Sequence, residues 1–138
     1  MESQRVKDYM TLQAVTFKPD MSLSIALQKV MKCTHLGGPV IDDQERVIGF
    51  LSEQDLLDKL VKVSYFCQDT HLVSDCMHEE VLSVSPDTTI IEMAEKMKIG
   101  KPKVYPVVDN EKLVGIISRR DVLRAIGKSI DDCFKHPV

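Results

Sequence analysis

The chain has 138 residues, of which 43% are hydrophobic and 28% charged, a composition typical of one globular domain or of two small units that share a core. Its 18 basic and 21 acidic side chains give a net charge of −3, which excludes a broad basic surface for nucleic acid and an acidic disordered tail. The apolar runs are far shorter than the roughly 20 residues that cross a bilayer, and residues 1–20 lack the apolar centre of a signal peptide, so we expect a cytoplasmic protein with no membrane partner.

The first half of the chain predicts a strand, a helix, two paired strands and a second helix. Apolar side chains recur at helical spacing from Leu23 to Met31, and a Pro-led apolar run ends at Asp42-Asp43 before a second apolar run returns. In chain order we expect a strand at 14–17, a helix over 20–32, strands at 39–41 and 46–51, and a helix that begins at Ser52.

The second half repeats this order after a segment, 62–72, that contains Tyr65 and Phe66 and is expected to lie over the core. Thr89 and Glu92 form a capping-box pattern at the start of its first helix. We expect a strand at 81–84, a helix from Ile90 to Gly100, strands at 106–108 and 112–117, a helix from Ser118 and a loosely ordered tail.

The two halves are copies of one unit. A shift of 67 residues places Val6-Lys7-Asp8-Tyr9-Met10 on Val73-Ser74-Asp75-Cys76-Met77 and Pro39-Val40 on Pro106-Val107. One residue is lost near Glu45, and the shift is 66 from there on. The repeat predicts a first unit at 1–61, a connection at 62–72, a second unit at 73–127 and a tail at 128–138. The fold class is α/β (α+β), two strand–helix–strand–strand–helix units in a pseudo-twofold pair, since one small unit leaves a sheet face bare.

The motif Gly-x-x-Ser-x-x-Asp occurs once in each copy, at the junction of the last strand and the last helix. It comprises Gly49, Ser52 and Asp55 in the first copy and Gly115, Ser118 and Asp121 in the second. The glycine allows a ligand or another backbone to approach closely. The serine lies beside the free N–H groups of the helix start, where phosphate binds well, and the aspartate can accept the two hydroxyls of a ribose. The alternative is that each Ser–Asp pair only caps its helix.

These residues, together with Val-x-Asp-x-Met, Pro-Asp and Pro-Val-x-Asp in both copies, resemble a tandem pair of cystathionine-β-synthase (CBS) domains, the Bateman module. The resemblance covers residues 5–127 and implies a stand-alone CBS-pair protein. That family binds AMP, ADP, ATP or S-adenosylmethionine in clefts between its two units and needs no cofactor.

The resemblance assigns roles residue by residue. In the second copy, Asp121 would hold the ribose and Ser118 and Arg120 the phosphate, with Arg119 adding positive charge beside them. Tyr105 and Pro106 would flank the adenine, with the Tyr105 ring available for stacking or only for packing. In the first copy the equivalents are Asp55, Ser52, Gly38 and Pro39.

The two sites differ in charge. Glu53-Gln54 stand in the first copy where the second has Arg119-Arg120, and Lys101 and Lys103 align with Thr34 and Leu36. Guanidinium groups attract phosphate and a carboxylate repels it. We therefore expect a phosphorylated adenosine ligand in the second site and a neutral adenosyl group in the first.

Other chemistry has little support in the sequence. The pairs Cys33-x-His35 and Cys76-x-His78 occupy non-equivalent places in the two copies, so we predict no metal site. No nucleophile–base set or P-loop is present, so we predict that the chain is not an enzyme.

The sequence therefore predicts a regulatory module that senses an adenosyl compound, forms a homodimer through its amphipathic helices and acts on an unidentified partner protein by a change in the arrangement of its units. The alternative is a structural dimerisation or scaffolding module with no physiological nucleotide.

Overall fold

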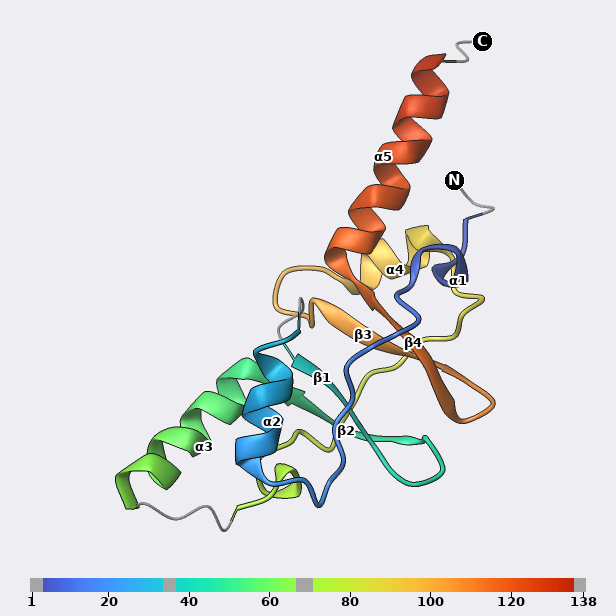
Figure 1. Cartoon of the computed structure of the whole chain (residues 1–138). Helices are drawn as coiled ribbons and strands as arrows, with labels where there is room; N and C mark the ends of the chain where they lie inside the picture. Colours follow the sequence, from blue (N-terminus) through green and yellow to red (C-terminus); the bar gives the residue numbers. More distant parts are fainter. Residues whose placement is uncertain (1–3, 34–36, 67–70, 136–138) are drawn as a thin grey trace. The chain divides into compact units, whose positions relative to one another are not determined.

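The computed structural model describes residues 4–33, 37–66 and 71–135. Within them the chain forms helices and two small antiparallel sheets, which confirms the predicted α+β class (Figure 1). In chain order the elements are α1 (Val6–Tyr9), α2 (Leu23–Val30), β1 (Gly37–Ile41), β2 (Val47–Ser52), α3 (Glu53–Phe66), a 3-10 turn (Val73–Asp75), α4 (Ile90–Lys96), β3 (Val104–Asp109), β4 (Lys112–Ser118) and α5 (Arg119–Lys135).

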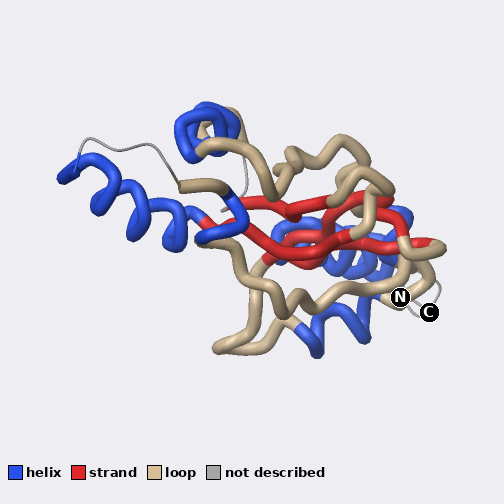
Figure 2. The backbone as a smooth tube through the Cα atoms, turned by 90° about the horizontal axis from the view of Figure 1, so that it is seen from below, coloured by secondary structure: helices blue, strands red, loops and turns tan. Residues whose placement is uncertain are grey.

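The packing divides these elements into two compact units. The α4–α5 unit contains residues 4–12, 83–109 and 114–135, and the α2–α3 unit contains residues 13–33, 37–66, 71–82 and 110–113. Each unit has its own hairpin, β3–β4 or β1–β2, drawn as paired red tubes in Figure 2.

The first segment of each repeat contributes to the core of the other repeat. Val6 is fully buried in the core of the α4–α5 unit, and Val73 is fully buried in that of the α2–α3 unit. The boundaries predicted at 1–61 and 73–127 remain a prediction about the sequence repeat. In the packing, residues 4–12 of the first repeat belong to the α4–α5 unit, and residues 71–82, which include the start of the second repeat, belong to the α2–α3 unit. We call these two stretches the exchanged segments.

Both exchanged segments pair with the return strand of a hairpin. The backbone of Thr11 exchanges two hydrogen bonds with Ile116 on β4, at 2.8 and 3.0 Å, and the backbone of His78 exchanges two with Phe50 on β2, both at 2.9 Å. The exchange therefore places His78 beside Phe50, two residues before β2 ends at Ser52.

The strands predicted at 14–17 and 81–84 are shorter than expected. Each supplies one parallel bridge, from Phe17 to Val40 on β1 and from Val84 to Val107 on β3. Pro19 and Pro86 follow two residues later, and a proline cannot donate to a sheet.

The last helix of each repeat is longer than predicted. Helix α3 runs to Phe66, into the predicted connection, and Tyr65 on it is exposed rather than over the core, while Cys67 lies outside the described residues. Helix α5 runs to Lys135, into the predicted tail. No proline lies within α5 to interrupt it.

A candidate nucleotide site at the strand-to-helix junctions

The motif glycines lie close to the backbone of the exchanged segments. A Cβ on Gly49 would lie 2.8 Å from the carbonyl oxygen of His78, and one on Gly115 would lie 2.7 Å from that of Thr11. Real side chains do not approach so closely, so both glycines are required by the exchanged segments beside β2 and β4. Of the two roles that the sequence left open for the glycine, the structure shows the approach of another backbone.

In the α4–α5 unit, Ser118 and Asp121 cap helix α5 reciprocally. The Ser118 hydroxyl oxygen accepts the Asp121 backbone N–H at 3.2 Å, and Asp121 Oδ2 accepts the Ser118 backbone N–H at 2.8 Å and its hydroxyl at 2.9 Å. Both residues are nearly enclosed, with 5% and 4% of their surfaces exposed. The capping role that the sequence left open is therefore present, and it holds the carboxylate in one orientation.

The second oxygen of Asp121 forms an ion pair. Arg124, one turn further along α5, donates to Asp121 Oδ1 from Nη2. The Arg124 side chain is 62% exposed whereas that of Asp121 is 5% exposed, so the guanidinium lies on the solvent side of the carboxylate. A ribose that reaches Asp121 must therefore displace or share this guanidinium.

In the α2–α3 unit, Ser52 and Asp55 cap α3 in a similar way. The Ser52 hydroxyl accepts the Asp55 N–H at 3.1 Å and donates to Asp55 Oδ2 at 2.7 Å. The same Oδ2 lies 2.7 Å from Nε2 of His78. The Asp55 side chain is 21% exposed, so this carboxylate is more accessible than Asp121.

The start of α5 carries exposed positive charge. Arg119 and Arg120 are exposed, and the Arg119 backbone N–H donates to the Lys103 carbonyl at 2.9 Å, which brings the exposed Lys101–Lys103 segment to the helix start. At the start of α3 the exposed residues are Glu53 and Gln54. The residues aligned with Lys101 and Lys103, Thr34 and Leu36, lie outside the described residues. The electrostatic contrast at the helix starts agrees with the charge difference seen in the sequence.

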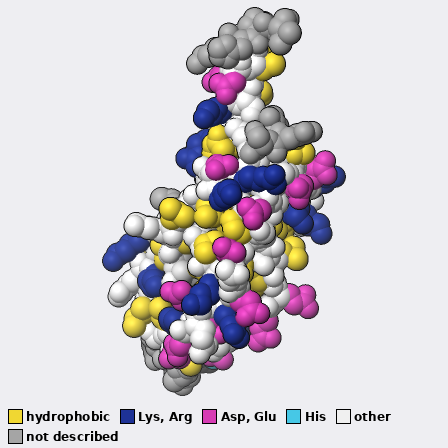
Figure 3. All heavy atoms as spheres, turned by 90° about the vertical axis from the view of Figure 1, so that its right-hand side faces the viewer, with side chains coloured by type: hydrophobic (Ala, Val, Ile, Leu, Met, Phe, Trp, Pro, Cys, Tyr) yellow, Lys and Arg dark blue, Asp and Glu magenta, His cyan; other side chains and the backbone are white. Residues whose placement is uncertain are grey.

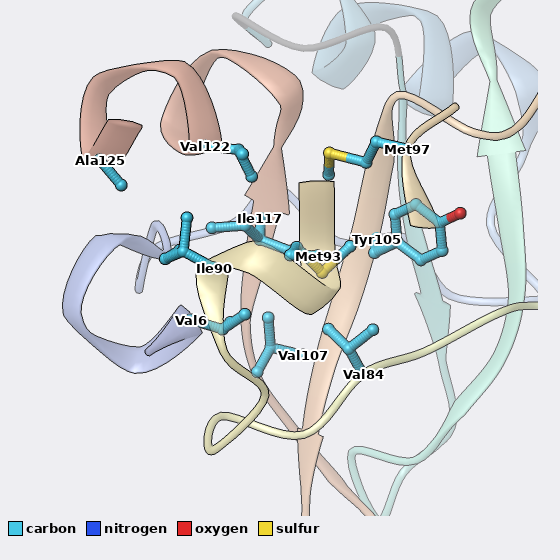
Figure 4. Packing of buried hydrophobic residues seen from close by; sticks show 10 residues of the cluster. All are labelled: Val6, Val84, Ile90, Met93, Met97, Tyr105, Val107, Ile117, Val122 and Ala125. Atoms are coloured by element: carbon cyan, nitrogen blue, oxygen red, sulfur yellow. The ribbon is translucent and has the colours of Figure 1, made fainter. Parts of the chain in front are cut away.

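Tyr105 belongs to the core. It is 3% exposed, its ring lies between Met97 and Val84 (Figure 4), and its hydroxyl donates to the Lys96 carbonyl at 3.1 Å. Burial raises the pKa of this tyrosine. The ring therefore has the packing role, one of the two that the sequence left open, and its faces are buried.

The prolines and Gly38 lie on buried strands. The carbonyls of Pro39 and Pro106 accept the N–H groups of Phe17 and Val84, both at 3.0 Å. A Cβ on Gly38 would lie 2.4 Å from the Val15 carbonyl oxygen. These residues hold the neighbouring segments against β1 and β3.

The family model for the CBS domain matches residues 6–62 and 73–128. This chain belongs to the CBS domain family. The tandem pair predicted from the sequence is thereby confirmed, as is its fold class.

Similar proteins include further CBS pairs. The CBS-pair protein CBSX2 from Arabidopsis thaliana is 30% identical, with a TM-score of 0.80 over 93% of this chain and 97% of that one. A structure of CBSX2 in complex with AMP is 31% identical, with a TM-score of 0.78 over 91% and 98% of the two chains.

Two relatives are larger proteins. Inosine-5'-monophosphate dehydrogenase of Aquifex aeolicus is 32% identical over 120 residues, which are 83% of this chain and 23% of that protein. The uncharacterized protein MJ1225 of Methanocaldococcus jannaschii is 24% identical over 97% of this chain and 46% of its own length. The chain thus spans less than half the length of these two relatives.

Two residues that contact the motif aspartates, Arg124 and His78, were not identified from the sequence. Arg124 stands three residues after Asp121, a spacing at which helical side chains meet, so the signal was available. His78 was considered only as a metal ligand, because its contact with Asp55 depends on the exchange of segments.

Within the described parts of the chain, no group of three or more histidine, cysteine, aspartate or glutamate side chains is arranged to hold a metal ion. The described helices are also too short or too polar to cross a membrane.

Proposed function

We propose that this chain is a regulatory module that binds an adenosyl compound, with AMP the first candidate. Binding of this ligand would alter the activity of a partner protein. The observation that carries the proposal is the repeated Ser–Asp pair, which presents an oriented carboxylate beside the start of a long helix in both CBS units. The AMP complex of CBSX2, at 31% identity over 91% of this chain, supports the same ligand class.

In the α4–α5 unit we assign phosphate binding to Ser118, Arg119 and Arg120 and ribose binding to Asp121. The exposed guanidinium groups and the helix start both favour an anion. The base would lie beside Pro106 and the backbone of Tyr105, since the Tyr105 ring is buried. This site therefore suits a nucleotide.

In the α2–α3 unit the corresponding residues are Ser52 and Asp55, with Gly38 and Pro39 beside the base. Glu53 at the start of α3 opposes a phosphate, so a neutral adenosyl group, as in adenosine or S-adenosylmethionine, is the better ligand there.

Regulation would arise from a population shift. A ligand moves an equilibrium between two arrangements only as far as its affinities for them differ. An adenosyl compound that binds one arrangement of the CBS units more tightly would thus change the surface offered to the partner.

Isothermal titration of the purified chain with AMP, ATP, adenosine and S-adenosylmethionine tests the proposal. We expect saturable binding of AMP, which weakens when Asp121 is replaced by asparagine and not when Asp131, exposed near the end of α5, is replaced in the same way. A chain that is folded by circular dichroism and binds none of the four compounds at millimolar concentration would refute it.

The second candidate function is a dimerisation module, and a specific observation favours it. Large apolar side chains are exposed on the last helix of each repeat, Leu57 and Val61 on α3 and Leu123 and Ile130 on α5, between 47% and 61% exposed. Figure 3 shows apolar side chains exposed among charged ones on the face that it presents. We propose that these helices form a homodimer interface, which is compatible with ligand binding and would remain if no nucleotide binds.

A further inference from the structure

The two motif aspartates have basic partners that come from different positions of the repeat. Asp121 is paired with Arg124, three residues later on the same helix. The position that aligns with Arg124 in the first repeat is Asp58, which cannot pair with Asp55 and instead accepts a hydrogen bond from Gln54 at 3.1 Å.

The α2–α3 unit obtains its basic partner from the exchanged segment. His78 places Nε2 2.7 Å from Asp55 Oδ2, and the residue that aligns with His78 in the other copy is Thr11, which has no charge. Each motif carboxylate thus has a cationic or proton-donating partner, Arg124 in one unit and His78 in the other. These two residues occupy different positions of the repeat, and the residue at the equivalent position in the other copy does not pair with the carboxylate.

His78 has a fixed backbone and a largely exposed ring. Its backbone N–H and carbonyl both bond to Phe50 at 2.9 Å, which fixes its Cα beside β2. Its side chain is 64% exposed, so few packing contacts keep the ring on the carboxylate. Asp55 does not need the ring for its orientation, because the Ser52 hydroxyl already binds Oδ2 at 2.7 Å.

We propose that His78 is a specificity-determining residue of the α2–α3 site, where its ring occupies the Oδ2 atom of the carboxylate that would bind the ribose hydroxyls. This inference rests on the proposed function. A ribose that donates one hydroxyl to each oxygen of Asp55 must exchange the imidazole at Oδ2 for one of its own O–H donors, whereas a ligand without these hydroxyls gains nothing from Asp55. His78 therefore lowers the affinity for ribosyl ligands selectively, as an internal competitor.

The magnitude follows from the exposure of the pair. Partly exposed ion pairs contribute up to about 1 kcal/mol, which corresponds to about a fivefold change in affinity. Removal of the His78 ring should thus tighten adenosine binding at this site about two- to fivefold. The backbone bridge to Phe50 does not involve the ring, so the variant keeps its segment in place.

Amide NMR titrations of the full chain test the proposal, with the Gly49 signal as reporter for the α2–α3 site and Gly115 for the other. Adenosine and 2',3'-dideoxyadenosine are compared on the unmodified chain, His78→Ala and His71→Ala. His71 is the matched control, because it is a partly exposed histidine of the same unit that lies 3.8 Å from another carboxylate, Asp75. We expect His78→Ala to tighten adenosine at Gly49 and to leave dideoxyadenosine, Gly115 and the His71→Ala titrations unchanged.

A second variant separates competition from a change in fold. On an Asp55→Asn background, His78→Ala should no longer alter adenosine affinity, since the competition needs the carboxylate. An equal gain for adenosine and dideoxyadenosine, a loss of adenosine affinity, or a gain that persists on the Asp55→Asn background would each overturn the role of His78 while AMP binding stands. If neither glycine signal responds to any adenosyl compound, the proposed function fails and this inference fails with it.

Discussion

Replacement of Asp121 by alanine tests the geometry of the α4–α5 site most directly. The substitution leaves the Ser118 N–H, nearly enclosed, without its acceptor, which costs about 1–3 kcal/mol, and removes the partly exposed pair with Arg124, which contributes up to about 1 kcal/mol. We expect a loss of about 2–3 kcal/mol in the free energy of unfolding. For a chain of this size that lowers the melting temperature by roughly 8–12 °C, at about 4 °C per kcal/mol.

The matched variant is Asp55→Ala in the other unit. The partners of Asp55 are the Ser52 hydroxyl and the His78 ring, both side-chain groups, and its carboxylate is more exposed. Its loss should cost only about 1 kcal/mol, because water replaces the lost partners of a partly exposed group. Thermal melts followed by circular dichroism compare the two variants, and urea unfolding supplies the free energies. If Asp55→Ala destabilises the chain as much as Asp121→Ala, the reciprocal cap on α5 does not have the strength that its geometry implies.

Four further outcomes are expected. Arg120→Ala should weaken AMP about three- to tenfold and leave adenosine unchanged by titration calorimetry, while Lys128→Ala, also exposed on α5, changes neither; an equal effect on both ligands would contradict the phosphate assignment. Gly115→Ala should lower the free energy of unfolding by about 1–3 kcal/mol because its Cβ meets the Thr11 carbonyl, whereas Gly127→Ala, in open space on α5, should raise it by up to about 1 kcal/mol. Urea unfolding measures both, and a Gly115→Ala chain as stable as the unmodified one would contradict the close approach. Light scattering should give twice the 15.6 kDa of the chain, and Leu123→Glu should shift the mass toward the monomer; a monomer before substitution would refute the helix interface. Burial raises the pKa of Tyr105, so its contribution to the free energy of unfolding is complete below about pH 10 and is lost as pH rises towards the folded pKa. Between about pH 9 and 11, Tyr105→Phe should therefore lose less stability than the unmodified chain. If the two chains lose stability with the same slope, the burial of this hydroxyl is contradicted.

The repeat, the order of the elements and the motif could all be predicted because they depend on local signals. Helix α2 begins after Ser22 and α4 after Thr89, each with a side-chain cap, and the hairpins return where polar residues interrupt the apolar runs. The serine at the start of α3 and of α5 was recognised for the same reason, since a cap acts within three residues of itself. The contact of Arg124 with Asp121 is local as well, because residues three apart on a helix lie on the same face.

The exchange of segments is decided by tertiary packing. Val6 and Val73 begin equivalent segments of the repeat. The sequence of these segments does not by itself determine which of the two hydrophobic cores each valine enters. The choice depends on complementary surfaces that are distant in the sequence, and hydrophobic periodicity records only that a residue is buried, not against what. From that choice follow the closeness of Gly49 to His78 and of Gly115 to Thr11, and the histidine on Asp55.

The direction of Tyr105 is a second feature of this kind. The predicted strand began at Pro106, whereas β3 begins at Val104 and includes Tyr105. A strand exposes alternate faces, and whether the ring turns toward the helices or away depends on which face of the hairpin α4 covers. The ring lies on the covered face, where it packs with Met97 and Val84 and donates to Lys96. Local patterns along the chain therefore define its elements, the residues of the Ser–Asp pairs and the Arg124 partner of Asp121. Long-range packing decides that His78 lies on Asp55 and that the Tyr105 ring is withdrawn from solvent, because these contacts depend on neighbours that only the folded chain brings together.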